Sequence, residues 1–205
     1  RSLTYESKLG ELSEYQRKAN YTSYLTEYQS EGLRINGLLT IPDGEQPAGG
    51  WPAIVFVHGY IPPDSYQTTQ KYVEYVDYLA RNGFVVFKID LRGHGDSEGE
   101  ANGAYYSSDY MIDTLNARAA LQAADFVNPE KIGLWGHSMA GNVVLRSLAV
   151  KPEIPAAVIW AGAVYSYSDW QEYGLSDHSF VLTQERKSDR DAKRQALYDT
   201  HGQFD

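Results

Sequence analysis

The sequence predicts an α/β fold in which a mostly parallel sheet is covered by helices on both faces. Continuous apolar runs such as PAIVFVHGY (52–60) and FVVFKID (84–90) are typical of strands buried on both faces. Longer stretches with apolar residues at helical spacing separate these runs, so strand and helix alternate from residue 53 to residue 164. Alternation at this spacing indicates parallel strands joined by right-handed crossovers.

The N-terminal residues follow a different pattern. Residues 1–20 are polar and charged, and we interpret them as an N-terminal arm or a short helix. Residues 21–30 (YTSYLTEYQS) alternate and are rich in Tyr and Thr, which is typical of a half-exposed strand. After the turn at Glu31-Gly32, residues 33–42 return as a second strand. We therefore expect an antiparallel pair at one edge of the sheet.

The remaining elements follow in order after a Gly- and Pro-rich loop at 43–50. Their ends are marked by glycine or proline, which cannot easily continue a helix. The tyrosines of the first helix share one face and are interpreted as packing residues: Tyr72, Tyr75 and Tyr78. The predicted buried strands are 52–60, 84–90, 131–136 and 156–164, and the predicted helices are 70–83, 109–127 and 142–152.

The chain then changes character, because no buried-strand run follows residue 164. We divide it into an N-terminal arm (1–20), the N-terminal part of an α/β core (21–164) and a charged segment (165–205). The last segment is interpreted as the start of a cap or lid, or as an insertion.

The composition excludes several kinds of partner and site. The chain has 205 residues, a formal net charge of −9 and no cysteine. Because an acidic surface repels phosphates, we expect no nucleic-acid partner and no membrane binding. Without cysteine there is no disulfide, thiolate nucleophile or cysteine-ligated metal. No sequence signal fixes the compartment, although the start at Arg1 rather than Met favours an exported protein.

A serine stands between small residues where a predicted strand meets a predicted helix. Residues 136–141 read GHSMAG. A sharp strand-to-helix turn strains the serine backbone and pushes its hydroxyl outward. The neighbours must be small because strand and helix nearly touch, and the helix N-terminus favours a developing negative charge. The pattern predicts a nucleophile at Ser138.

Three segments together resemble the α/β-hydrolase superfamily of serine hydrolases. GHSMAG (136–141) resembles its nucleophile elbow, Gly-x-Ser-x-Gly, with Ala140 in place of the second glycine. HGY (58–60) resembles the family's oxyanion loop, and DLRGHGDSEG (90–99) resembles its Asp-x-Arg-Gly-x-Gly-x-Ser segment. The match covers residues 21–164 and is most similar to the prolyl-oligopeptidase-like and dienelactone-hydrolase-like branches. It implies an α/β-hydrolase fold whose C-terminal strands are missing from this chain.

The resemblance implies roles for three residues. Ser138 would attack an acyl carbon and carry the acyl-enzyme. The backbone N–H groups of Met139 and Tyr60 would form the oxyanion hole. No cofactor and no metal are expected, because the segment HGDSEGE (94–100) matches no calcium or zinc pattern.

The histidines before the nucleophile are interpreted as structural. His58 and His94 belong to loops that the family uses for shape. His137 is adjacent to Ser138 in sequence, and its side chain is expected to point away from the elbow.

The general base and its acid remain to be placed. In this family the acid and then the histidine follow the nucleophile, each after a further strand. The candidates in this order are Asp169, Asp177, His178 and His201, and no predicted strand would hold them rigidly. We therefore expect the acid and the histidine to come from a second segment or chain, a C-terminal fragment of the same protein.

Three functions remain open at this point. The first is hydrolysis of small carboxylic esters through an acyl-enzyme on Ser138. The second is a peptidase or amidase of the prolyl-oligopeptidase type, since the fold alone does not select the substrate. The third is an inactive fragment or scaffold that lacks its acid and base.

Overall fold

The computed structural model describes residues 5–104 and 107–165, with isolated positions of the C-terminal segment at 169, 188, 192, 195, 196 and 199. Contacts divide the chain into a core unit, Arg1–Ala163, and a C-terminal unit, Val164–Asp205. The proposed cap (165–205) falls almost entirely outside the described residues. Within the described part of the chain, no helix has the length and apolar character needed to cross a membrane.

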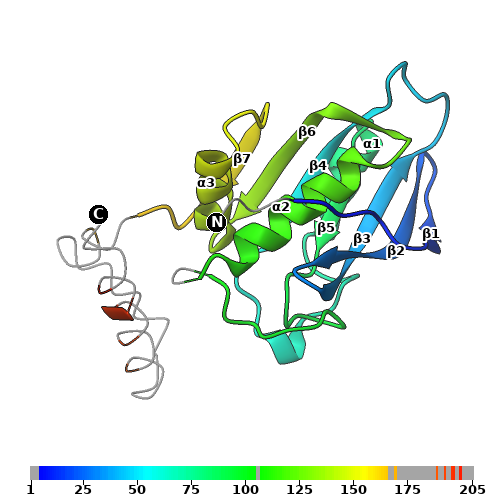
Figure 1. Cartoon of the computed structure of the whole chain (residues 1–205). Coiled ribbons are helices and arrows are strands. Elements are labelled where there is room, and N and C mark those ends of the chain that lie inside the picture. The colour runs from blue at the N-terminus through cyan, green and yellow to red at the C-terminus, as the bar shows by residue number, and fades with distance from the viewer. Residues whose placement is uncertain are drawn as a thin grey trace. The chain divides into compact units, whose positions relative to one another are not determined.

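The core unit is built on a seven-stranded mixed sheet with the order β1-β2-β3-β5-β4-β6-β7 (Figure 1). The first strands and the contact of β3 with β5 are antiparallel, whereas β5, β4, β6 and β7 run parallel. The parallel part is the region in which strand and helix alternate in sequence. The strands are β1 (Ser13–Arg17), β2 (Tyr21–Ser30), β3 (Leu33–Pro42), β4 (Trp51–Val57), β5 (Val85–Ile89), β6 (Val127–His137) and β7 (Ala157–Trp160).

The predicted antiparallel pair is confirmed as β2 and β3, which are paired along their full length from Tyr21 to Pro42. Glu31 and Gly32 both have positive φ (51° and 80°), as a tight hairpin turn of this hand requires. The pair does not form the edge of the sheet, because β1 lies outside it. We predicted an arm or a short helix there, since SEYQR is polar throughout and all five residues of β1 are exposed.

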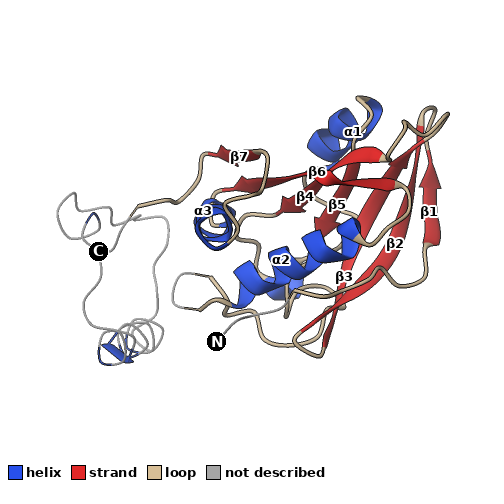
Figure 2. Cartoon of the chain, turned by 45° about the horizontal axis from the view of Figure 1, so that its top comes forward, coloured by secondary structure: helices blue, strands red, loops and turns tan. Residues whose placement is uncertain are grey.

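Helices cover both faces of the sheet, as predicted. Figure 2 shows α1 (Val73–Arg81) above the sheet, and α2 (Asp109–Gln122) and α3 (Ala140–Val150) below it. A short 3₁₀ helix (Pro63–Ser65) precedes α1. The side chains explain this arrangement, because successive residues of a strand point to opposite faces. One buried cluster joins the sheet to α2 and α3, and a smaller one contains Phe56, Val86 and Trp135 with Val76 of α1.

Two helix boundaries differ from the prediction for identifiable reasons. The first helix starts at Val73 rather than at residue 70, because Lys71 and Tyr72 have positive φ (55° and 56°). The predicted helix 109–127 ends at Gln122, and β6 begins at Val127. Asn128 and Pro129 therefore lie in a strand, at an irregularity between the pairs Trp51–Val127 and Ala53–Ile132. Proline is tolerated where the ladder is interrupted.

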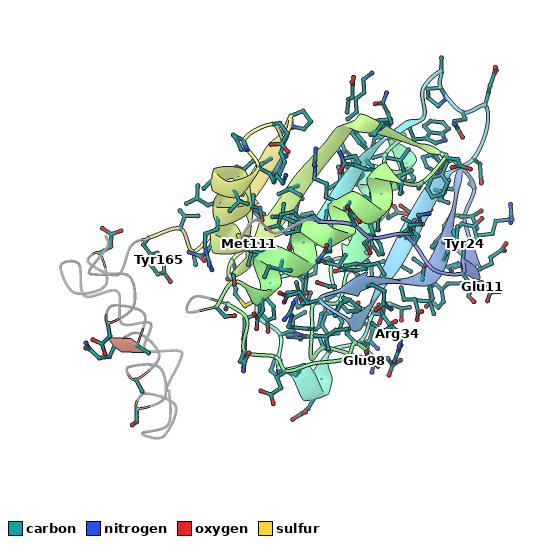
Figure 3. The ribbon with its side chains drawn as sticks, in the orientation of Figure 1. Glu11, Tyr24, Arg34, Glu98, Met111 and Tyr165 are labelled. Atoms are coloured by element: carbon teal, nitrogen blue, oxygen red, sulfur yellow. The ribbon has the colours of Figure 1, made fainter. Side chains whose placement is uncertain are left out.

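The segment after β5 is fastened to the rest of the core unit. Arg34 of β3 and Glu98 lie side by side (Figure 3), and each donates a backbone N–H to the other (2.8 and 2.9 Å). Arg92 is buried and its guanidinium pairs with Asp113 of α2 (2.8 Å). The motif at 90–99 thus joins the sheet, the β2–β3 hairpin and α2.

Candidate active site

Ser138 lies at the sharp turn between β6 and α3. Its φ is +52°, a left-handed conformation that is costly for a residue with a side chain. The Ser138 N–H donates to the carbonyl of Trp160 (3.1 Å). The Ser138 carbonyl accepts hydrogen bonds from the N–H groups of Gly141 (2.9 Å) and Ala163 (2.8 Å). The turn therefore has the strained geometry that the sequence predicts for a nucleophile elbow.

Close packing explains the small residues around Ser138. A Cβ on Gly136 would lie 2.7 Å from the Ala140 carbonyl oxygen, and a Cβ on Gly141 would lie 2.5 Å from the Cα of Gly162. Ala140, at the second glycine position of the motif, is the first residue of α3 and is fully buried. Its methyl group is accommodated at this position, so the departure from glycine leaves the turn intact.

The loop 58–60 runs beside this turn. Strands β4 and β6 are parallel and Val57 pairs with Gly136, so both segments leave the sheet at the same edge. A Cβ on Gly59 would lie 3.0 Å from Nδ1 and 3.1 Å from the carbonyl oxygen of His137. The loop 58–60 and His137 are therefore in direct contact.

The two residues predicted to supply oxyanion donors lie on these neighbouring segments. Met139 follows Ser138 with helical backbone angles at the start of α3, where N–H groups point out of the helix end. Tyr60 follows Gly59 in the loop, and its side chain is 45% exposed. The elbow and the loop thus bring Tyr60, Ser138 and Met139 to one edge of the sheet. Their roles in catalysis remain predictions.

His58 anchors the start of the loop 58–60. Its ring is completely buried, with Nδ1 2.7 Å from the Gly59 carbonyl oxygen and Nε2 3.0 Å from the Asp90 carbonyl oxygen. Burial, together with the neighbouring His94 ring, lowers the pKa of His58 to about 4. His94 is also buried, and its Nδ1 lies 3.1 Å from the Arg92 carbonyl oxygen. Both rings have the surroundings that a structural role requires.

Tyr72 occupies a position that the sequence did not indicate. Its hydroxyl accepts the N–H of Gly59 (2.9 Å) and lies 2.8 Å from Nδ1 of His137. We interpreted Tyr72, Tyr75 and Tyr78 as one packing face, but their surroundings differ. Tyr78 is 63% exposed, and Tyr72 precedes the helix in a left-handed conformation. Because residues 71 and 72 are Lys and Tyr rather than glycine, the sequence carries no signal of this left-handed turn.

His137 is part of an aromatic cluster. Its ring packs on Trp160 (ring centroids 4.7 Å apart) and near Tyr72 (5.6 Å). Burial lowers the pKa of His137, which favours the neutral ring. Nδ1 of the neutral ring and the Tyr72 hydroxyl share a hydrogen bond, whose donor is set by the tautomer of the ring. Nδ1 of His137 is thereby bound to Tyr72.

The acid and base candidates that follow Ser138 stay predictions. Asp177, His178 and His201 lie outside the described residues. Asp169 is described, but it belongs to the C-terminal unit. Within the described part of the chain, the hydrogen bonds to histidine rings involve backbone carbonyls and the Tyr72 hydroxyl, and none involves a carboxylate.

Comparison with known sequences agrees with this geometry. The profile of a hydrolase family described as "Serine aminopeptidase, S33" matches residues 52–184. Polyketide transferase claH of Penicillium crustosum is 28% identical over 160 residues, covering 77% of this chain and 49% of that protein. The uncharacterized peptidase YtmA of Bacillus subtilis is 26% identical over 166 residues, covering 81% of this chain and 56% of that protein. The chain thus spans about half the length of these curated relatives.

Solved structures show the same fold. An acetyl xylan esterase from Paenibacillus sp. R4 aligns with a TM-score of 0.66 and 16% identity, covering 98% of this chain and 63% of that chain. The α/β hydrolase GrgF from Penicillium sp. sh18 aligns with a TM-score of 0.57 and 20% identity, covering 89% of this chain and 68% of that chain. Since the family profile covers more than half of the chain, the protein belongs to the α/β-hydrolase family described as serine aminopeptidase, S33.

Proposed function

We propose that the protein is a serine hydrolase that cleaves small carboxylic esters through an acyl-enzyme on Ser138. The observation that carries this proposal is the strained, left-handed Ser138 at the start of α3, with the loop 58–60 beside it. A strained backbone is retained where surrounding contacts enforce it, and such sites are often functional. The esterases among the structures of similar fold support the ester class.

The geometry suggests the following steps. The Ser138 Oγ attacks the acyl carbon while a base takes its proton, and the N–H groups of Met139 and Tyr60 bind the oxyanion. The intermediate collapses, the ester C–O bond breaks, and the protonated base gives its proton to the leaving alcohol. Water then attacks the acyl-enzyme by the same route and releases the carboxylic acid and free Ser138.

The base and its acid are proposed to lie on a further segment of the same protein that pairs with β7. β7 is the last strand of the sheet, and Ala157, Val158 and Trp160 are exposed. An exposed apolar strand edge is a template for another strand. This segment is the C-terminal fragment that the sequence led us to expect.

A peptidase or amidase is the second candidate. The family description and the relatives named probable dipeptidyl-aminopeptidase B favour it, and acyl transfer to Ser138 is the same for an amide. The candidates differ in the leaving group, an alcohol or an amine. Hydrolysis of p-nitrophenyl acetate compared with dipeptide p-nitroanilides separates them, because the proposed esterase has the higher kcat/KM on the ester.

An inactive scaffold is the third candidate, since within the described residues no base contacts Ser138. Fluorophosphonate labelling followed by intact-mass measurement tests it. In the longer protein that includes the proposed base and acid, we expect one adduct on the wild type and none on Ser138→Ala, with Ser147→Ala as a control that still labels. An unlabelled wild-type protein would refute the proposed function.

A further inference from the structure

Gly59 sits in a space that admits no side chain. A Cβ at this position would lie 2.9 Å from the Tyr72 hydroxyl and 3.0 Å from Nδ1 of His137. The first contact is shorter than real Cβ atoms show and the second is tighter than nearly all of them, so the backbone of the loop 58–60 approaches both side chains directly. At this short distance the Gly59 N–H donates a hydrogen bond to the Tyr72 hydroxyl.

The carbonyl on the other side of Gly59 is held as well. It lies 2.7 Å from Nδ1 of His58, which is completely buried. This carbonyl belongs to the same peptide group as the Tyr60 N–H. In a trans peptide the N–H points opposite to the carbonyl, so a carbonyl directed at His58 turns the Tyr60 N–H away from the protein interior.

Hydrogen bonds at alternate residues, Tyr66, Thr68 and Gln70, fix the loop that leads to Tyr72. The hydroxyl of Tyr66 donates to the Asp90 carboxylate (2.8 Å), and so does that of Thr68 (2.5 Å). The Gln70 carbonyl accepts from the buried ammonium of Lys88 (2.8 Å). Two non-glycine residues with positive φ, Lys71 and Tyr72, then end the loop. Such strain persists only where surrounding contacts enforce it, and here it presents the phenol to Gly59.

We propose that Tyr72 is a positioning residue for the oxyanion hole. Its hydroxyl holds the Gly59 N–H and joins the loop 58–60 to His137, the residue before the nucleophile. Tyr72 holds the His58–Gly59 peptide, and the His58 ring faces the carbonyl of the next peptide, whose N–H belongs to Tyr60; together they restrain the N–H that faces the developing oxyanion. The catalytic consequence rests on the proposed hydrolase function, whereas the contact between Tyr72 and Gly59 does not.

The Tyr72→Phe variant tests the proposal because it removes one oxygen and keeps the ring that packs on Phe56 and Trp135. Tyr78→Phe, in helix α1 directly after Tyr72 and 63% exposed, is the matched control. We expect exchange of the Gly59 amide, followed by NMR, to accelerate about tenfold in Tyr72→Phe. Amides of the central strand β5 should keep their wild-type rates, and Tyr78→Phe should change neither.

Kinetics provide the second readout. In the active enzyme we expect Tyr72→Phe to lower kcat about tenfold with KM within twofold of wild type, since the contact acts on the oxyanion rather than on substrate binding. An unchanged Gly59 exchange rate, or acceleration of Gly59 and β5 alike, would overturn the proposal. So would faster Gly59 exchange with unchanged kcat in an active enzyme. If wild type shows no hydrolysis but Gly59 exchanges as expected, only the proposed function fails.

Discussion

The structural elements on the two sides of Ser138 differ in how many hydrogen bonds and buried side chains fix them in the core unit. On one side, the loops after β4 and β5 are anchored by the buried side chains of His58, Asp90 and Arg92, whose groups join them by hydrogen bonds to α2 and to each other. On the other side, β7 lies at the end of the sheet, with Val158 and Trp160 each about half exposed (51% and 43%). In the hydrolase that we propose, the described residues would supply the nucleophile and the oxyanion hole, and a further segment would supply the acid and the base.

The largest expected effect comes from Asp113, a buried residue that binds the loop after β5. Asp113 is fully buried and accepts hydrogen bonds from the Arg92 backbone and guanidinium and from the Ser30 hydroxyl. We expect Asp113→Asn to lower the free energy of unfolding by about 3–5 kcal/mol, because Arg92 loses its one fully buried carboxylate, keeping only the more exposed Glu31 and Asp109, and an amide then faces donors. Urea denaturation measures this.

A matched control lies at the opposite edge of the sheet. Glu14 of β1 pairs with Arg17 (3.1 Å), and both side chains are more than half exposed. Glu14→Gln should change the free energy of unfolding by less than about 0.5 kcal/mol. If Asp113→Asn and Glu14→Gln lowered the free energy of unfolding equally, the hydrogen bonds of Asp113 would not stabilise the loop after β5.

The next effect is the pH dependence contributed by His58. Its pKa is lowered by burial to about 4, from an ordinary value of 6.5, so the unfolded chain takes up the proton first as pH falls. The contribution to stability is fully present above pH 6.5 and is lost between pH 6.5 and 4, by about 3 kcal/mol in total. An NMR titration of the His58 ring should show it neutral down to about pH 4. Titration at or above 6.5 would mean that the carbonyls of Gly59 and Asp90 hold it as a cation.

A smaller effect, of opposite sign, is expected at the elbow itself. Ser138→Gly should raise the free energy of unfolding by about 1 kcal/mol, because glycine adopts φ +52° without strain. Ser147→Gly, in the middle of α3, should instead lower it by a similar amount. Thermal or urea unfolding of both variants checks the pair. Destabilisation by Ser138→Gly would show that the left-handed turn stores no strain.

Much of this architecture was predictable because it depends on local patterns. The alternation of apolar runs and helical stretches predicted the parallel strands and the helices on both faces of the sheet. The small residues around Ser138 gave the elbow, whose left-handed φ the structure confirms. Strand β1 escaped prediction because its five residues are exposed and polar, and it exists through pairing with β2 rather than through burial.

The position of Tyr72 could not be predicted for a different reason. Its contact with Gly59 depends on two left-handed residues, Lys71 and Tyr72, that carry no sequence signal of such a turn. The hydrogen bonds that enforce them come from residues distant in sequence, such as Lys88. The acid and base stayed open because their candidates Asp177, His178 and His201 lie outside the described residues.

The smallest expected effect is at β7, the exposed strand beside Ser138. Val158 of β7 pairs in register with Trp135, so it lies on the same face of the sheet as the buried Val86 of β5. In a chain of residues 1–205, Val158→Lys should change the free energy of unfolding by less than about 0.5 kcal/mol, because the ammonium stays in water. Val86→Lys, at a fully buried site, should cost about 4 kcal/mol or more, or prevent folding.

The same substitution also tests what β7 contacts. If a further segment of the protein pairs with β7, Val158→Lys should cost about 2 kcal/mol or more in the longer protein that includes it, because the ammonium is then buried against apolar side chains. It should also reduce self-association of the 1–205 chain in sedimentation, since a charge on an edge strand opposes pairing with a second copy. Equal, small effects in both proteins would mean that the acid and base reach Ser138 without covering β7.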